Sequence, residues 1–165
     1  MYEVFPKKKD STARNLAAIL FIVAVIAMYI STLPGLPLRS LVQLLSVGLI
    51  AFGLVIMGRY IFSSYSYAVV RTDEGGCDFI VTEIKRRSRI TVCRISVSGI
   101  ESVEVLKKGE GERLAALKKG RKSFDYRVDM MTDRYCCILA NECGEAVAIK
   151  ISYDERLISL LSEMK

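Results

Sequence analysis

Two long uncharged stretches stand next to each other near the start of the chain. Residues 15–38 and 40–58 contain no ionised side chain, and only Arg39 separates them. A helix of about 20 apolar residues is long enough to cross the hydrocarbon core of a bilayer. The pattern predicts two transmembrane helices, over residues 15–33 and 41–58, joined by a turn at Pro34-Gly35-Leu36-Pro37.

Few polar groups lie inside the predicted spans, where Gln43 and Ser46 are the clearest. No ionisable residue marks a transport path, which favours an anchor. Gly48, Gly53 and Gly58 recur every five residues, and we expect them to allow close packing of the two helices.

After residue 60 the apolar residues alternate with polar ones, which is typical of half-buried β-strands. The strictest alternation runs over residues 124–130 and places Asp125 and Asp129 on an outward, solvated face. A hairpin turn over residues 131–133 is expected to join this strand to the next one. Strands are predicted over residues 66–71, 77–84, 89–95, 99–106, 124–130, 134–140 and 145–151.

The last segment has the pattern of an amphipathic helix. Ser152 and Glu155 have the spacing of a capping box, in which each side chain satisfies a free amide at the start of a helix. The apolar stripe that follows predicts a helix packed on the sheet of its own domain. Its members are Leu157, Ile158, Leu161 and Met164.

Seven antiparallel strands followed by one α-helix predict an all-β barrel or bent sandwich that the helix closes. This order, with the strand run from Tyr65 and the segments 89–105 and 152–157, resembles a bacterial pleckstrin-homology-like (PH-like) domain placed after a membrane hairpin. The resemblance implies a binding or scaffolding module. The expected division is a basic N-terminus (1–14), a transmembrane hairpin (15–61) and a PH-like domain (62–165).

Positive charge flanks the predicted hairpin on both sides, within a chain of 165 residues and net charge +6. Four basic residues precede the first span within residues 7–14, and more follow from Arg59 onward, whereas the connecting turn has only Arg39. Basic flanks stay on the cytoplasmic side, so both termini are expected in the cytoplasm at the inner or plasma membrane. The alternative of a cleaved signal peptide is disfavoured because a second span follows at once.

Two basic clusters in the β region are candidate contacts for anionic lipid or for a protein partner. The alternative is ordinary solvated loops. By the resemblance, lipid-binding relatives carry their basic motif in the first interstrand loop, which is here the acidic Asp73-Glu74, so phosphoinositide recognition there is not expected. The candidate residues are Lys85, Arg86, Arg87 and Arg89, and Lys107, Lys108, Lys118, Lys119, Arg121 and Lys122.

Residues for catalysis are sparse. The chain has no His and five Cys without C-x-x-C spacing, which predicts reduced, half-buried thiols rather than a metal site or disulfides. Of the adjacent Cys136 and Cys137, one is expected in the core, because neighbouring side chains on a strand point to opposite faces. Gly109-Glu110-Gly111 lacks the ending of a phosphate loop. The sequence therefore predicts no catalytic residue, metal or cofactor.

Three functions fit these observations. The favoured one is a membrane-anchored, non-enzymatic binding or scaffolding protein that recognises a protein or peptide, for example by adding a strand to an exposed sheet edge. The second is a module that senses anionic lipid of the inner leaflet. The third is an accessory subunit of a membrane enzyme or export complex. Nucleic acid is not expected, because residues 107–122 contain no aromatic side chain between their basic ones.

Overall fold

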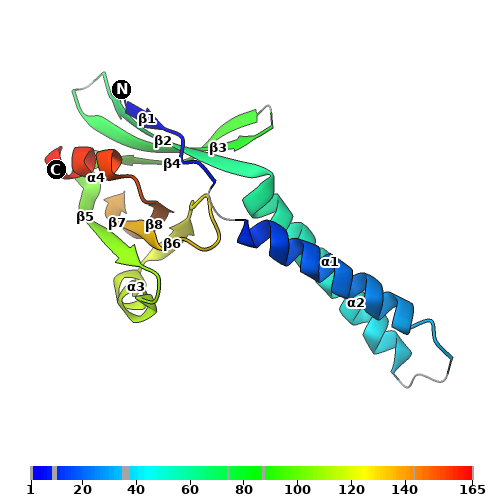
Figure 1. Ribbon diagram of the computed structural model, residues 1–165. Helices are drawn as coiled ribbons and strands as arrows, with labels where there is room; N and C mark the ends of the chain where they lie inside the picture. The colour runs from blue at the N-terminus through cyan, green and yellow to red at the C-terminus, as the bar shows by residue number, and fades with distance from the viewer. Residues whose placement is uncertain are drawn as a thin grey trace. The chain divides into compact units, whose positions relative to one another are not determined.

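The computed structural model describes residues 2–8, 11–34, 38–73, 75–86, 88–142 and 144–164. The chain forms two compact units (Figure 1). Residues 10–62 form a helical hairpin, and residues 1–9 together with 63–165 form a unit of two sheets. The N-terminal residues therefore belong to the β unit, a division that the periodicity did not predict.

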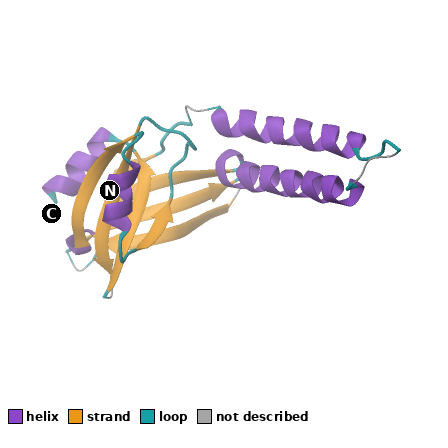
Figure 2. Cartoon of the chain, turned by 90° about the horizontal axis from the view of Figure 1, so that it is seen from below, coloured by secondary structure: helices purple, strands orange, loops and turns teal. Residues whose placement is uncertain are grey.

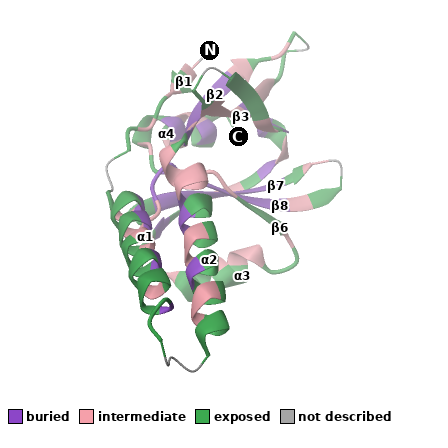
Figure 3. Ribbon diagram, turned by 90° about the vertical axis from the view of Figure 1, so that its right-hand side faces the viewer, coloured by how far each residue is buried: buried purple, intermediate pink, exposed green. Residues whose placement is uncertain are grey.

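The hairpin unit consists of α1 (Thr12–Ile30), α2 (Arg39–Ile56) and a π-helical turn, η1 (Met57–Ile61). Both helices are long and apolar enough to cross a membrane. Most of their large apolar side chains are exposed, and much of both helices is coloured green for exposed residues in Figure 3. Helices begin and end close to the predicted positions, and residues 35–37 of the expected turn lie outside the described residues.

Only one of the three glycines packs against the partner helix. A Cβ placed on Gly53 would lie 3.1 Å from the ring of Phe21, so a larger residue here would require this ring to shift. Gly48 and Gly58 have no atom within 4 Å of such a Cβ, and the prediction for them is wrong. Ser46 is buried, and its hydroxyl donates to the Val42 carbonyl of its own helix at 2.9 Å.

Sheet A contains four antiparallel strands in the order β1-β2-β3-β4. Three of them lie where the alternation predicts them. The fourth, β1, was not predicted, and it pairs Val4 with Tyr67 and Tyr2 with Val69. The chain therefore leaves sheet A after β1, forms the helical hairpin, and returns to the same sheet as β2, the neighbour of β1. The bounds are β1 (Tyr2–Val4), β2 (Ser63–Arg71), β3 (Cys77–Lys85) and β4 (Ser88–Ser96).

Sheet B also has four strands, in the order β5-β7-β8-β6, and a 3-10 turn (η2, Val97–Gly99) leads into it from β4. The predicted strand 124–130 is wrong in length and pairing. Its residues form only the end of β6, which runs parallel to β8 and does not pair with β7. The expected hairpin at 131–133 is therefore absent. The bounds are β5 (Ile100–Lys107), β6 (Lys122–Asp125), β7 (Arg134–Glu142) and β8 (Glu145–Ser152).

The main core lies between the two sheets, which do not close into a barrel (Figure 2). Tyr67 and Phe79 of sheet A meet Ile138 and Ile149 of sheet B in one buried cluster. Sheet A and sheet B exchange no strand, so the sheets keep open edges. The barrel alternative is therefore excluded, and the sandwich alternative agrees with this packing.

The C-terminal helix α4 (Glu155–Glu163) packs on this core as predicted, because Leu157 and Leu161 are fully buried in it. Its cap differs from the prediction. Asp154 is the N-cap, and its carboxylate accepts from the Leu157 N–H at 2.9 Å. The hydroxyl of Ser152 instead accepts from the Val128 N–H at 3.0 Å.

Between β5 and β6, helix α3 (Gly111–Lys118) covers the outer face of sheet B. Its Leu114 and Leu117 pack on a second buried cluster that includes Cys137 and Leu139 of β7. The helix is therefore amphipathic, with these two leucines on the face toward the sheet. It contributes a second, smaller core on the side of sheet B away from sheet A.

Candidate functional site

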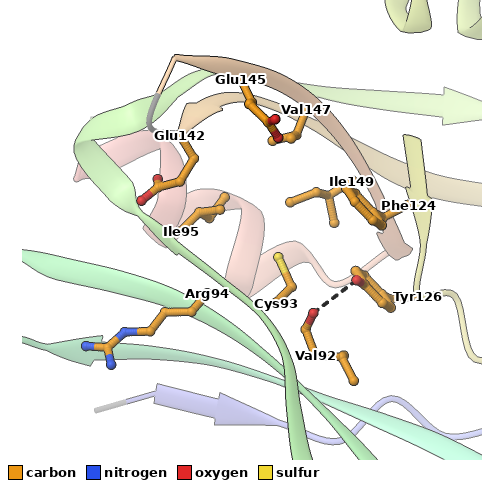
Figure 4. A pocket seen from close by; sticks show the side chains of 10 residues that line it. All are labelled: Val92, Cys93, Arg94, Ile95, Phe124, Tyr126, Glu142, Glu145, Val147 and Ile149. Atoms are coloured by element: carbon orange, nitrogen blue, oxygen red, sulfur yellow. Dashed lines mark hydrogen bonds between the residues drawn. The ribbon is translucent and has the colours of Figure 1, made fainter. Parts of the chain in front are cut away.

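A cleft that can hold a ligand lies where the open edges of the two sheets face each other (Figure 4). Its volume is about 510 Å³, within the range of ordinary ligand sites. Strand β4 supplies four consecutive residues, and sheet B supplies the opposite wall. The lining residues are Val92, Cys93, Arg94, Ile95, Phe124, Tyr126, Glu142, Glu145, Val147 and Ile149.

Both strands that flank the cleft are edge strands. β4 pairs only with β3, and β6 only with β8, among the residues described. An edge strand presents backbone N–H and C=O groups that can pair with a further strand. The β3–β4 register shifts so that Thr82 pairs with Thr91 and Val81 with Cys93. Val92 is therefore the extra residue of a β-bulge, and it lies at the cleft.

Aromatic side chains form one wall of the cleft. The rings of Phe124 and Tyr126 are parallel, with centroids 6.2 Å apart. The Tyr126 hydroxyl donates to the Val92 carbonyl at 3.2 Å, which links the end of β6 to the bulge in β4. The ring of Tyr65 also lies against that of Tyr126, with centroids 5.6 Å apart. Because Tyr126 is held in this way and Phe124 is 41% exposed, Phe124 is the aromatic surface offered to a ligand.

Several polar groups of the cleft are paired with neighbouring residues. Arg94 points away from it in Figure 4 and pairs with Asp78 at 2.6 Å. Glu145 pairs with Lys122 at 2.6 Å, and Glu142 lies opposite Ile95. Burial, with a smaller effect of the Glu142 charge, raises the pKa of Cys93 to about 11. Its thiol is therefore protonated at neutral pH and is a poor nucleophile.

The first predicted basic cluster lies at one end of sheet A. Lys85 closes β3, Arg86 is in the turn with φ of 48°, and Arg89 is the second residue of β4. All three are exposed, and Lys85 pairs with Glu83 at 3.0 Å. Arg87 lies outside the described residues. This cluster is thus a tight, solvent-facing turn.

The second predicted cluster is spread over α3 and its flanks. Arg121 and Lys122 form ion pairs with Glu101 at 2.7 Å and with Glu145 at 2.6 Å. Burial lowers the pKa of Lys118, and the neighbouring Lys150 lowers it further. Lys107, Lys108 and Lys119 remain exposed. Two residues of this cluster are therefore ion-paired within the β unit, and three are exposed without an ion pair among the described residues.

The expectation of a solvated face for Asp125 and Asp129 is wrong. Asp129 is buried, and Asp125 accepts from Arg127 at 2.8 Å and from Lys150 at 3.1 Å. Burial by itself would raise the pKa of Asp125, but the hydrogen bonds and charge of Arg127, with the charge of Lys150, lower it to about 2. The pairing of β6 with β8 places Lys150 beside Asp125, which local alternation does not predict.

Of the cysteines, Cys77, Cys93, Cys136 and Cys137 are free thiols, and Cys143 lies outside the described residues. Cys136 and Cys137 are both buried, although only one was expected in a core. Cys136 points into the main core, and Cys137 into the cluster beneath α3. Because α3 covers the outer face of sheet B, both faces of β7 are buried.

Comparison with protein-family models, with curated proteins and with solved structures finds no match for this chain. The cleft itself was not found from the sequence, because 25 residues separate β4 from β6 and the two strands become neighbours only when the sheets pack. One signal was present: Phe124 and Tyr126 are the only aromatic residues between residues 80 and 134.

Proposed function

We propose that this protein is a membrane-anchored, non-enzymatic binding protein. Its β unit is a PH-like module that holds an extended segment of a partner protein. The hairpin crosses the membrane with both termini in the cytoplasm, and the cleft between β4 and β6 is the binding site. One observation carries the proposal: an apolar cleft of about 510 Å³ lies along the unpaired edge of β4.

The membrane anchor is supported by the hairpin helices, whose apolar side chains face outward along their length. The pairing of β1 with β2 adds a second argument. A chain that crosses a bilayer twice returns to the side from which it started. The two flanks of the hairpin can therefore share one sheet only if both lie on the same side, and the excess of Lys and Arg in the flanks favours the cytoplasm.

Binding of an extended segment is supported by the form of the cleft. Strand addition supplies affinity through backbone hydrogen bonds and specificity through pockets for alternate side chains. Here the β4 edge offers the backbone groups, and Phe124, Val147 and Ile149 offer apolar contact. Protonated Cys93 and the paired Arg94 support a role in contact rather than in bond-making.

The test uses the full chain in lipid nanodiscs and a library of random peptides. Peptides selected on the protein should bind roughly tenfold or more weakly to Phe124→Ala, because truncation of a central aromatic contact removes much of the binding energy. Val105→Ala is the control, since Val105 is also exposed but lies on β5. N-methylation of alternate peptide amides should abolish binding. Peptides that bind both variants equally would contradict the proposed site.

A further inference from the structure

A set of basic side chains gathers at the end of sheet A to which the hairpin is attached, and we propose that it is a contact surface for anionic lipid headgroups. The basic collar is defined as Lys7, Lys85, Arg86 and Arg89. The proposal rests on the membrane-spanning hairpin of the proposed function, but it is independent of the cleft and its ligand.

Strand register places the β3–β4 turn at this end. Ser63 is the first residue after the hairpin unit, and it pairs with Lys85, which in turn pairs with Ser88. Paired Cα atoms in antiparallel strands are about 5 Å apart, and consecutive Cα atoms about 4 Å. The Cα of Lys85 is therefore within about 10 Å of that of Phe62, the last residue of the hairpin unit.

The N-terminal segment reaches the same end from the other side of the sheet. β1 runs antiparallel to β2, so the residues after Val4 continue toward the Ser63 end. The Arg89 guanidinium lies 5.9 Å from the centre of the Phe5 ring, which joins the N-terminal segment to β4. Lys7 follows Phe5 by two residues and so lies within about 7 Å of it along the chain.

The charges of the collar are open to solvent. Arg86 and Arg89 are exposed and form no ion pair within the described part of the chain. Lys85 has Glu83 as its partner, and the Asp129 charge acts on the neighbouring Lys8, which is not counted in the collar. Positive charge therefore remains in excess at this end of the sheet.

Two large apolar side chains stand among these charges. Phe5 is 50% exposed and Ile90 is 56% exposed, although neither lies at the cleft. Basic residues interspersed with exposed aromatic and aliphatic residues are typical of surfaces that rest on the headgroup region. The attraction of Lys and Arg to an anionic leaflet falls off within a Debye length of about 8 Å. Basic side chains therefore feel this attraction only if they lie close to the end of the membrane-spanning helix.

The test compares lipids around the full chain in bilayers. The protein is reconstituted in phosphatidylcholine, and electron spin resonance measures its preference for spin-labelled phosphatidylglycerol over spin-labelled phosphatidylcholine. The wild-type chain should prefer the anionic lipid by roughly three- to tenfold, and rising ionic strength should reduce this preference. In the triple variant Lys85→Gln/Arg86→Gln/Arg89→Gln, the ratio of anionic to zwitterionic lipid affinity should fall close to one.

The matched control is Lys107→Gln/Lys108→Gln/Lys119→Gln, which removes the same charge from exposed positions around α3. It should keep the wild-type preference. An equal loss in both triple variants, or a preference unchanged by the collar variant, would overturn the proposal. A chain that incorporates into the bilayer without any preference refutes the collar alone, whereas a chain that does not incorporate refutes the anchor and the collar together.

Discussion

The two basic clusters of the β unit look alike in sequence, but the structure uses them differently. In the segment around α3, charged side chains are drawn into ion pairs and packing: Arg121 binds Glu101, Lys122 binds Glu145, and Lys118 is half-buried. In the β3–β4 turn, Arg86 and Arg89 face solvent at the end of the sheet that carries the hairpin. Local charge density therefore does not distinguish a structural cluster from an available one.

The difference follows from what lies next to each cluster. α3 packs over sheet B, whose outer face carries Glu104, Cys137, Lys150 and Asp125 in one row across the strands. Basic residues at its ends therefore meet acidic partners, as Arg113 meets Glu104 at 2.6 Å. In the β3–β4 turn, among the residues described, only Lys85 has an acidic partner of this kind.

The largest expected effect concerns the network beneath α3. Asp125→Asn leaves Lys150 and Arg127 half-buried without their shared carboxylate, and it should lower the free energy of unfolding by about 3 kcal/mol. Thermal and denaturant unfolding of the full chain in detergent would measure this. Asp73→Asn, at an exposed turn, is the control and should change stability by less than about 0.5 kcal/mol. Equal stability of the two variants would contradict a structural role for the network.

The same network predicts a dependence on acid. The pKa of Asp125 is about 2 in the folded chain against an ordinary 3.8, so the unfolded chain binds the proton more readily. The ionised Asp125 contributes about 2 kcal/mol to stability; this is complete above about pH 5 and is lost progressively as the pH falls through 3.8 toward 2. Unfolding measured across this range should show the loss in the wild type and a smaller slope in Asp125→Asn. Identical slopes would refute the shifted pKa.

A smaller loss of stability is expected when the packing of helix α3 on sheet B is weakened. Leu117→Ala removes a half-buried side chain from the cluster with Leu106 and Leu139, and it should cost about 1.5 kcal/mol, less than for a fully buried leucine. Hydrogen exchange should become faster in α3 and stay unchanged in β2. Ala116→Gly would serve as a comparison, because Ala116 is exposed and tests helix propensity alone.

The smallest change in stability is expected for substitutions in the β3–β4 turn. Arg86→Gln/Arg89→Gln should change the free energy of unfolding by less than about 0.5 kcal/mol, since neither guanidinium is buried or ion-paired within the described residues. Arg121→Gln removes the ion pair with Glu101 and should cost about 1 kcal/mol. If the turn variant were the less stable of the two, the distinction between the clusters would fail.

Much of the architecture could be read from local pattern. Among the residues described, six of the eight strands lie close to where periodicity places them, and so do the helical hairpin and the C-terminal amphipathic helix. The failures have a common form. β1 is three residues long and is a strand only because β2 lies beside it, and β6 ends at Asp125 because its partner is β8 rather than β7. Pairing between segments distant in sequence decides where these two strands form and end, and the local alternation of apolar and polar residues does not predict that pairing.

The amino-acid sequence alone determined the apolar hairpin, the β-rich unit and the terminal helix, because each depends on a periodicity that neighbouring residues carry. Tertiary structure alone decided that the first residues join sheet A, that β4 and β6 face each other across a cleft, and which basic residues keep their charge free. These properties depend on which residues far apart in the sequence come into contact. Burial and ion pairing affect a side chain only after those contacts have formed.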